Sequence, residues 1–375
     1  MQVAIVIHDF LPDNGQGRYA IEISRRLAGR CAMHVYANRL PEQPPAGVTC
    51  HRVPAYRPRY ALAIASFLVA SEPQLRRQPR LLIHAQGLTC WSADIATVHV
   101  CNAARARTLA PADRGSWWFS RCIMPLEARF YRQQRLRHVI TMSHRLAREV
   151  AQFYQWSKPV SVIPHGTDTT LFRPVRDEIE RRTLRSELGV PPTSWCWLFV
   201  GEAVKGLATA IDVLPRFPHA HLIVVSRSDP RPYQQQAERL GVLGRIQFRG
   251  FDPETPRVYR AADVLVYPTQ YESFGMVVAE AMASALPVIV GREAGVAELI
   301  EDQTTGLLVP ADNPDALTAK LRLLAHDAPF ARALGSAARA TIERHSWDRC
   351  AEATWEAYQA AWSAKSLASN STSRA

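Results

Sequence analysis

Residues 262–290 read ADVLVYPTQYESFGMVVAEAMASALPVIV and predict a strand, a loop, a helix and a second strand in direct succession. The first apolar run ends near Pro268 and has the length and composition of a buried strand. The second, PVIVG at 287–291, follows a helix-length segment. Strands joined by a helix form parallel pairs, and helices cover both faces of the resulting sheet. The stretch therefore predicts an α/β fold.

The same alternation of apolar runs with amphipathic segments occurs twice along the chain. The first set consists of VAIVIH (3–8), MHVYA (33–37), LLIHAQG (81–87), IATVHV (95–100), HVITMS (138–143) and VSVIPHG (160–166). The second set follows a polar helical stretch at 175–188 and consists of WCWLFVG (195–201), HLIVVS (221–226), RIQFRG (245–250), ADVLVYP (262–268), PVIVG (287–291) and GLLV (306–309). We therefore expect two Rossmann-like domains with an interdomain cleft, which is the default ligand site in such proteins.

The expected boundaries follow from this pattern. The turn-rich IPHGTDTTLFRP at 163–174 marks the hinge between domain 1–166, which we expect to bind an acceptor, and domain 167–346, which we expect to bind a nucleotide-sugar. A closing helix at about 347–364 is amphipathic and could pack back on the first domain. The Ser-rich tail 365–375 is expected to be disordered.

Composition excludes several classes of protein. The chain has 375 residues, 47% of them hydrophobic and 21% charged, which is ordinary for globular domains. Its longest apolar run, 61–70, is about half the ~20 residues that a membrane-spanning helix needs, and no basic leader precedes the first strand. The seven cysteines show neither a C-x-x-C pair nor metal-ligand spacing. We expect a cytoplasmic protein without a structural metal.

The net charge of +11 is unevenly divided. Residues 1–166 hold 22 Lys and Arg against 9 Asp and Glu, whereas the remainder holds 23 against 25. Within the first part, 103–137 is rich in arginine and aromatic residues, as expected of a segment that binds an anionic membrane surface or an acceptor. A solvated helix with a core of aromatic side chains is about as well supported. A nucleic-acid partner fits the charge, but no recognised motif accompanies it, so none is expected. The residues predicted to contact a membrane or acceptor are Arg114, Trp117, Trp118, Arg121, Arg129 and Arg132.

Two acids near one helix start indicate a nucleotide-sugar site. Glu272 lies in the loop, and Glu280 lies about one turn inside the helix, where it can accept hydrogen bonds from a ribose. Backbone amides at a helix N-terminus hold phosphate groups well. A capping role for Glu272 and a surface role for Glu280 are the simpler alternatives for either acid alone. The residues of this constellation predicted to bind a donor are Glu272, Ser273, Phe274, Gly275, Met276, Val277 and Glu280.

Four residues complete the candidate site. Gly15 and Gly17 lie where the first strand meets a helix, although a simple turn explains them at least as well. Lys205, before a helix, is a point charge suited to phosphate, and a solvated lysine is the alternative. His99 follows an apolar strand and would face the cleft, although a lone histidine is more often structural.

With these residues the chain resembles glycosyltransferase family 4, whose two-domain architecture is called GT-B. The resemblance covers almost all of 1–362 and is carried by VIPHGTDTTLFRP, FVGEAVKG and YESFGMVVAEAMASALPVIV. It implies sugar transfer from a nucleoside diphosphate donor, UDP- or GDP-linked, with retention of configuration and no cofactor or metal. It also implies catalytic roles for His99, Lys205 and Glu272 and donor binding by Gly15, Gly17, Lys205 and the Glu272–Glu280 constellation. The layout is also similar to that of lipopolysaccharide core glycosyltransferases.

Two departures from the family pattern stand out. The usual arginine between Gly201 and Lys205 is missing, so other cations such as Arg227 or Arg292 would have to help meet the diphosphate charge. Ala285 replaces a glycine in a small-residue turn. The predicted function is transfer to a glycolipid, lipopolysaccharide or polysaccharide at the cytoplasmic face of the inner membrane. A sugar-nucleotide epimerase or hydrolase and a non-catalytic peripheral membrane protein are the alternatives.

Overall fold

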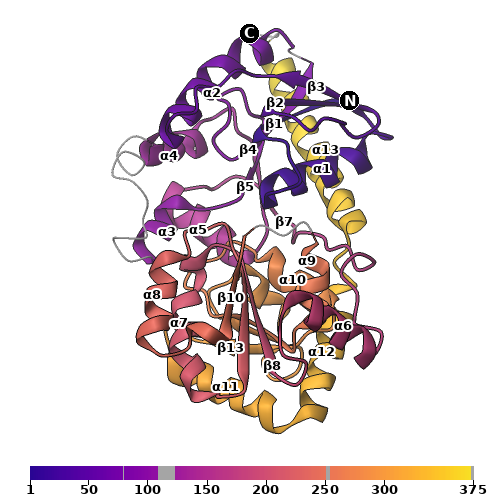
Figure 1. Ribbon diagram of the computed structural model, residues 1–375. Helices are drawn as coiled ribbons and strands as arrows, with labels where there is room; N and C mark the ends of the chain where they lie inside the picture. The colour runs from indigo at the N-terminus through magenta and orange to yellow at the C-terminus, as the bar shows by residue number, and fades with distance from the viewer. Residues whose placement is uncertain (79, 109–122, 251–253, 373–375) are drawn as a thin grey trace. The chain divides into compact units, whose positions relative to one another are not determined.

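The computed structural model describes residues 1–78, 80–108, 123–250 and 254–372 (Figure 1). The chain divides into two compact units, one of Met1–Gly166 with Trp347–Ala375 and one of Thr167–Ser346. Each unit contains one parallel sheet covered by helices. The predicted α/β class with two Rossmann-like domains is therefore confirmed.

The first unit is built on seven parallel strands in the order β3-β2-β1-β4-β5-β6-β7. Strands β1, β4 and β5 are almost wholly buried, since helices cover both faces of the sheet. The strands are β1 Gln2–Asp9, β2 Ala32–Arg39, β3 Val48–Arg52, β4 Leu81–Gln86, β5 Ile95–Val98, β6 His138–Thr141 and β7 Val160–Val162. The helices are α1 Gly15–Leu27, α2 Tyr60–Arg76, α3 Asn102–Thr108, α4 Met124–Arg132, α5 His144–Tyr154 and α13 Trp347–Thr372.

The second unit repeats this topology with six parallel strands in the order β10-β9-β8-β11-β12-β13. The strands are β8 Trp195–Val200, β9 Ala220–Val225, β10 Ile246–Arg249, β11 Val264–Tyr267, β12 Val288–Gly291 and β13 Leu307–Val309. The α-helices are α6 Glu178–Leu188, α7 Leu207–Val213, α8 Arg231–Arg239, α9 Thr255–Ala261, α10 Met276–Ala283, α11 Pro314–His326 and α12 Ala328–Ile342. Short 3₁₀ turns are η3 Ala203–Lys205, η4 Leu214–Arg216, η5 Leu243–Arg245 and η6 Gly295–Leu299.

The order of strands in each sheet reverses at one point. In the first unit the chain winds outward from β1 in one direction and from β4 in the other, and in the second unit β8 and β11 stand in the same relation. Ligands of open α/β sheets bind outside the carboxyl ends of the strands at such a switch point. The topology thus places one candidate site in each unit before any side chain is considered.

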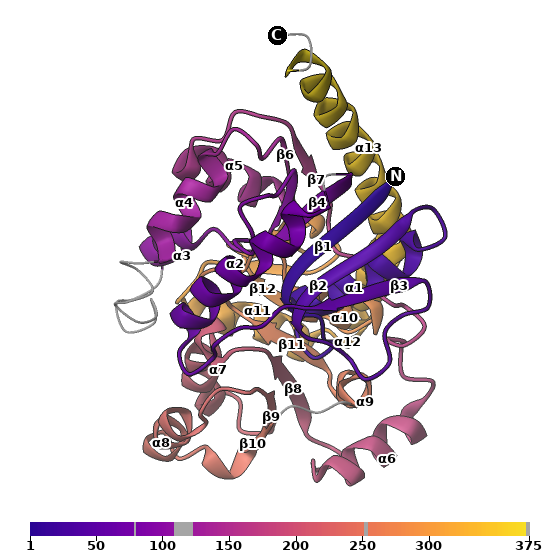
Figure 2. The ribbon, with the colours of Figure 1, turned by 90° about the horizontal axis from the view of Figure 1, so that it is seen from above.

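The closing helix α13 belongs to the first unit and lies against α1 (Figures 1 and 2). Its Tyr358 is buried and its hydroxyl lies 2.8 Å from Nδ1 of His84 on β4. Lys365 donates hydrogen bonds from Nζ to the Leu81 carbonyl at 2.6 Å and to Asp94 Oδ2 at 2.7 Å. These contacts join the end of the chain to the first sheet.

The expected disordered tail is wrong as far as Thr372, because α13 continues to that residue. A helix that already exists adds residues at little cost, since nucleation is the expensive step. The Lys365 contacts also order the segment beyond the apolar part of the helix. Residues 373–375 lie outside the described chain.

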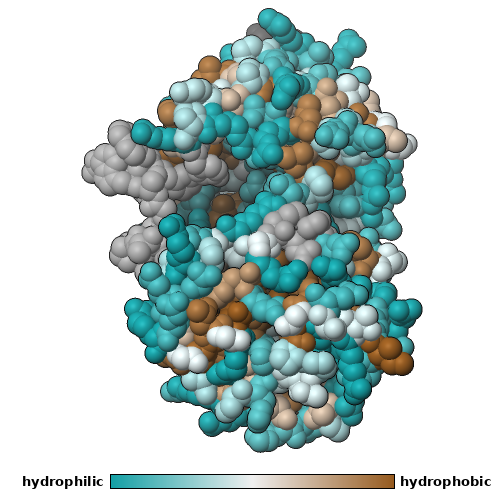
Figure 3. Space-filling model, viewed as in Figure 1, coloured by the Kyte–Doolittle hydropathy of each residue, from teal (hydrophilic) through white to brown (hydrophobic). Residues whose placement is uncertain are grey.

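The described helices include none with the length and apolar character required to cross a membrane. The face in Figure 3 carries mostly hydrophilic residues, with hydrophobic residues in scattered groups.

A buried carboxyl group holds together three helices of the first unit. Glu127 on α4 accepts hydrogen bonds from Asn102 Nδ2 at 2.9 Å and from the Tyr154 hydroxyl at 2.6 Å. Asn102 begins α3, and Tyr154 ends α5. Burial raises the pKa of Glu127 to about 7, although both hydrogen bonds act to lower it. The folded protein therefore favours the protonated, neutral carboxyl group.

We predict that Glu127 makes stability fall as the pH rises from its ordinary pKa of 4.5 through about 7. The unfolded chain loses this proton first, so the cost of ionising the folded carboxyl grows by up to about 1.4 kcal/mol per pH unit. Glu127→Gln keeps the size and both neighbours but removes the charge. Chemical unfolding should show the variant to be more stable than wild type at pH 8 and similar to it at pH 4.5. A difference independent of pH would contradict the assignment.

Candidate active site

The second unit brings Lys205 and Glu272 together at the carboxyl edge of its sheet. Lys205 ends the short η3 turn after β8, and Glu272 lies in the loop after β11. The Lys205 Nζ atom lies 2.6 Å from Glu272 Oε2, and the Tyr267 hydroxyl donates to the same oxygen at 2.8 Å. Neither charged side chain is more than a quarter exposed. Two residues 67 positions apart thus form one polar cluster at the switch point between β8 and β11.

The ionisation of this cluster is set by opposing effects. Burial raises the pKa of Glu272, but the charge of Lys205 lowers it, as do hydrogen bonds from Lys205, Tyr267 and the Phe274 backbone. The net result is a pKa below the ordinary value. Burial and the charge of Glu272 raise the pKa of Tyr267 well above its usual value, so its hydroxyl remains a neutral donor. At neutral pH the cluster offers a carboxylate acceptor beside an ammonium donor.

Glycines at fixed places determine this geometry. Gly206 has a left-handed φ of 104°, and a Cβ there would lie 2.7 Å from the Pro268 carbonyl oxygen. Gly275, with φ of 106°, precedes the first residue of α10, and a Cβ there would lie 3.1 Å from Val296. Only glycine combines such dihedral angles with such close approach. The two glycines allow the η3 turn and the 272–275 loop to pack as closely as they do.

Glu280 has a different partner from Glu272 and forms a hydrogen bond with Tyr259. It is 8% exposed on the inner part of α10, and its Oε2 atom accepts a hydrogen bond from the Tyr259 hydroxyl at 2.9 Å. That hydroxyl also lies 3.2 Å from the Val277 carbonyl oxygen. Of the other predicted donor-binding residues, Phe274 and Gly275 are buried, whereas Ser273, Met276 and Val277 are partly exposed. The two acids therefore have separate hydrogen-bonding partners within one loop and helix.

The first unit places His99 directly after β5. Its Nε2 atom lies 2.7 Å from Oε1 of Gln86, the last residue of β4. The Tyr19 ring on α1 meets the His99 ring edge-on at 5.5 Å between centroids, and the His165 ring lies 6.1 Å away. Burial, with the neighbouring His165 and His84, lowers the pKa of His99 well below 6.5. His99 is thus a neutral imidazole at the carboxyl edge of the first sheet.

Gly15 and Gly17 lie in the first turn of α1, after β1. The Gly17 amide donates to the side chain of Asn14, which caps the helix, at 2.8 Å. A Cβ on Gly17 would lie 2.0 Å from the Leu11 carbonyl oxygen. Glycine is therefore required at position 17 by packing, whether or not a phosphate binds nearby.

The predicted membrane or acceptor residues are only partly described. Arg114, Trp117, Trp118 and Arg121 lie outside the described residues. Arg129 and Arg132 lie on α4, where the Arg129 guanidinium is 6.0 Å from the Trp91 ring centroid and Arg132 Nε is 3.4 Å from the Tyr154 carbonyl oxygen. Of the additional cations considered, Arg292 lies 3.6 Å from Asp302.

Sequence reasoning missed Tyr267, Tyr259, Tyr19 and Gln86. The three tyrosines resemble ordinary core residues in the sequence. Gln86 offers a weak signal, because an amide at the end of the apolar run LLIHAQG falls where strand ends approach a ligand. In the part of the chain that the structure describes, no group of three or more His, Cys, Asp or Glu residues has the arrangement of a metal site.

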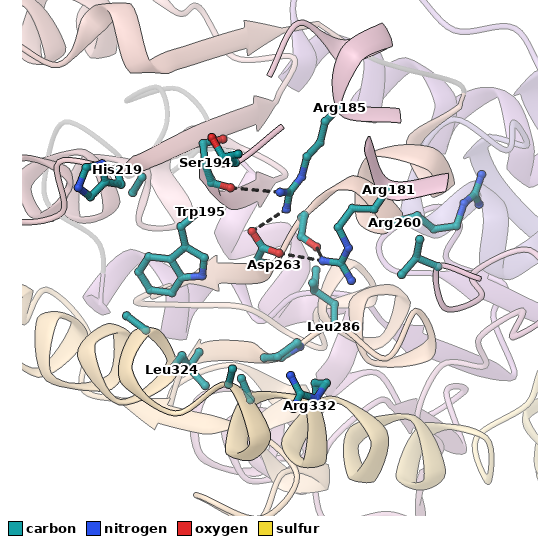
Figure 4. A pocket seen from close by; sticks show the side chains of 18 of the residues that line it. Arg181, Arg185, Ser194, Trp195, His219, Arg260, Asp263, Leu286, Leu324 and Arg332 are labelled. Carbon is teal, nitrogen blue, oxygen red and sulfur yellow. Dashed lines mark hydrogen bonds and ion pairs between the residues drawn. The ribbon is translucent and has the colours of Figure 1, made fainter. Parts of the chain in front are cut away.

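A hollow of about 1050 Å³ lies at the opposite edge of the second sheet. Its floor includes Trp195, Asp263 and Pro287, which begin or immediately precede β8, β11 and β12. Arg181 and Arg185 reach into it and both pair with Asp263, at 2.8 and 2.6 Å (Figure 4). This hollow contains none of the predicted site residues.

Two family models match the chain. One described as "Glycosyltransferase Family 4" matches residues 13–171, and one described as "Glycosyl transferases group 1" matches residues 180–341. A D-inositol 3-phosphate glycosyltransferase of Segniliparus rotundus is 32% identical over 236 residues, which are 59% of this chain and 52% of that protein. An uncharacterized glycosyltransferase of Methanocaldococcus jannaschii is 31% identical over 60% of each chain. The chain thus aligns with little more than half the length of these curated relatives.

Solved structures extend the likeness to nearly the whole chain. A sucrose-phosphate synthase from Thermosynechococcus elongatus has 22% identity and a TM-score of 0.82, covering 97% of this chain and 100% of that one. WaaG, a glycosyltransferase involved in lipopolysaccharide biosynthesis, has 20% identity and a TM-score of 0.79, covering 93% and 97%. Anabaena HepE in complex with UDP-glucose has 20% identity and a TM-score of 0.73, covering 98% and 100%. At these identities the likeness shows the fold, and the predicted GT-B class is confirmed.

Proposed function

Because the chain belongs to glycosyltransferase family 4, we propose that it transfers a sugar from a nucleoside diphosphate to an acceptor hydroxyl with retention of configuration. The observation that carries the proposal is the cluster of Lys205, Glu272 and Tyr267 at the carboxyl edge of the second sheet. It offers a cation for a diphosphate and a carboxylate for sugar hydroxyls within 2.6 Å of each other. A second acid, Glu280, lies within the same loop and helix.

Each residue has a proposed role in binding the donor. Lys205 and the first amides of α10 offset the charge of the diphosphate, so the transfer is proposed not to require a metal. Glu272 accepts hydrogen bonds from the sugar, and Glu280 accepts them from the ribose. Gly15 and Gly17 bring backbone amides of the first unit to the donor, and His99 binds a hydroxyl of the sugar or the acceptor.

The transfer step uses the donor itself as the base. The bond between the anomeric carbon and the diphosphate oxygen breaks, and the acceptor oxygen bonds to that carbon from the same face. The acceptor proton passes to an oxygen of the departing diphosphate. A retaining hydrolase instead uses two carboxyl groups about 5 Å apart across the sugar, one of them as a nucleophile. Glu272, paired with Lys205, is better placed to orient the sugar than to attack it.

The donor and acceptor are proposed at the level of chemical class. The HepE complex with UDP-glucose supports a UDP-linked donor, and GDP remains the other candidate. The likeness to WaaG, together with the +13 charge of residues 1–166, supports a glycolipid, lipopolysaccharide or polysaccharide acceptor. We propose that the protein works at the cytoplasmic face of the inner membrane as a peripheral protein.

A panel of nucleoside diphosphate sugars tests the proposal directly. A bound donor at 100 times its dissociation constant should stabilise the protein by about 2.7 kcal/mol, measured as a rise in the unfolding temperature. Product analysis with a saccharide acceptor should then show transfer with retained configuration. Free nucleoside diphosphate formed at the same rate without an acceptor would favour an epimerase or hydrolase. Failure of every donor to stabilise the protein would contradict the assignment.

Two alanine variants, with Tyr259→Phe as a milder third, should separate donor binding from the chemical step. Glu280→Ala should raise the KM for the donor more than it lowers kcat, and Tyr259→Phe should act in the same direction but more weakly, because it removes one hydrogen bond to Glu280. Lys205→Ala should lower kcat by about 10² or more, because charge develops on the leaving diphosphate. Steady-state kinetics with the donor varied measures both effects. Wild-type kinetics in both alanine variants would refute these roles.

Replacing Trp117 and Trp118 together by Ser tests the proposed membrane contact. The double variant should bind vesicles that contain anionic lipid less well than wild type in a flotation assay, because interfacial aromatic rings would be lost. Transfer to a short soluble acceptor should be unaffected. Vesicles of neutral lipid provide the control, since basic residues contribute there only weakly. Equal flotation of both proteins would argue against this segment as the membrane contact.

A further inference from the structure

A series of buried polar side chains connects α13 to His99 in the first unit. The Tyr358 hydroxyl lies 2.8 Å from His84 Nδ1, and His84 Nε2 lies 2.8 Å from the Thr97 hydroxyl. The Gln86 amide nitrogen lies 3.2 Å from His84 Nε2, and Gln86 Oε1 lies 2.7 Å from His99 Nε2. Apart from His99, all these residues are at most 3% exposed. Polar groups buried so deeply are costly unless they are paired.

This series of polar groups ends at the carboxyl edge of the first sheet, next to the switch point between β1 and β4. Gln86 is the last residue of β4, which lies between β1 and β5, and His99 follows β5. Strand order reverses between β1 and β4, so both side chains lie at the edge where α/β sheets bind ligands. The contact between Gln86 and His99 therefore affects how His99 can hydrogen-bond to a ligand at that edge.

The hydrogen bonds define which nitrogen of His99 carries the proton. A neutral imidazole has one N–H donor and one acceptor nitrogen. The amide nitrogen of Gln86 faces His84, so its oxygen faces His99, and an amide oxygen can only accept. With Gln86 in this orientation, His99 donates from Nε2, which leaves Nδ1 with a lone pair. Among the described residues, none forms a hydrogen bond with Nδ1 of His99.

We propose that Gln86 is a positioning residue, which holds His99 in the Nε2–H tautomer and so presents Nδ1 as a hydrogen-bond acceptor to a substrate hydroxyl. The opposite tautomer would present a donor to the same hydroxyl. The role of the tautomer in transfer rests on the function proposed above, whereas the tautomer itself does not. Partners of this kind commonly set the tautomer of functional histidines.

Nitrogen-15 labelling of the histidines in the ligand-free full-length protein tests the tautomer. Long-range proton–nitrogen spectra distinguish Nε2–H from Nδ1–H, and the spectrum of His99→Asn identifies the His99 signals. Wild type should show neutral His99 protonated at Nε2. Gln86→Met, similar in size but without an acceptor, should show a mixture of tautomers and lower kcat by about tenfold, roughly the value of one hydrogen bond.

Gln86→Glu supplies a second test, in which the tautomer should stay the same and the pH dependence of activity should change. Its carboxylate keeps the acceptor for Nε2–H, so the tautomer should persist, but its charge should raise the pKa of His99. The acid limb of kcat/KM against pH should therefore move upward by a unit or more. Thr89→Val is the matched control, because Thr89 is 1% exposed, follows the same strand and donates to the Val6 carbonyl at 2.9 Å. It should change neither the tautomer nor the pH profile.

Two outcomes overturn the proposal: His99 protonated at Nδ1 in wild type, or a Gln86→Glu variant whose tautomer and pH profile both equal those of wild type. If Gln86→Met does not fold, the Gln86→Glu variant alone tests the positioning role of Gln86.

The proposed sugar transfer can be refuted independently of this positioning role. A wild-type protein with the expected tautomer that transfers no sugar would refute the transfer and leave the positioning of His99 intact.

Discussion

The parallel pairing of β8 with β11 is the constraint on which the candidate site depends. Trp197 pairs with Val264 and Leu198 with Leu265, so the two strands end side by side although they are distant in sequence. Their carboxyl ends carry Lys205 and Glu272 to within 2.6 Å of each other. A partly buried ion pair stabilises little by itself, since desolvation offsets much of the attraction. Under the proposed function, its value is that it holds a cation and a carboxylate in fixed positions for a charged ligand.

The sheets were predictable because their strands are buried on both faces. Such strands are continuous apolar runs, and all six runs predicted for the second unit are strands in the structure. The edge strand β3, Val48–Arg52, was missed because its residues are partly exposed and include Cys50, His51 and Arg52. The helical tail to Thr372 was missed because its order comes from Lys365 contacts with Leu81 and Asp94, far away in sequence. The pattern of neighbouring residues in the sequence does not reveal contacts with residues so far away.

In the candidate site, too, local features were predictable from the sequence and long-range contacts were not. The proximity of Glu272, Gly275 and Glu280 was predictable, because one loop and the helix start that follows it bring them together locally. The contacts of Tyr259, Tyr267 and Gln86 were not predictable, because they join these side chains to residues that only the fold brings near. Tyr259 and Glu280 are 21 positions apart and meet only when α9 and α10 pack. Tyrosine satisfies the apolar pattern of a core while still delivering a hydroxyl, so the sequence shows the first property and conceals the second.

In the second unit, a count of cations points to a different edge of the sheet than the strand topology does. Residues 167–346 hold 20 Lys and Arg against 22 Asp and Glu, yet arginines gather around the hollow at the amino edge. There Arg181 and Arg185 both pair with Asp263, and Arg185 also donates to the Ala261 carbonyl. These contacts hold α6 against the sheet, so the two cations already have structural partners. At the carboxyl edge Lys205 faces Glu272, whose other donors among the described residues are the neutral Tyr267 hydroxyl and the Phe274 amide. The proposed binding site therefore rests not on the number of cations but on where the strands end and on which hydrogen-bonding positions the fold leaves to a ligand.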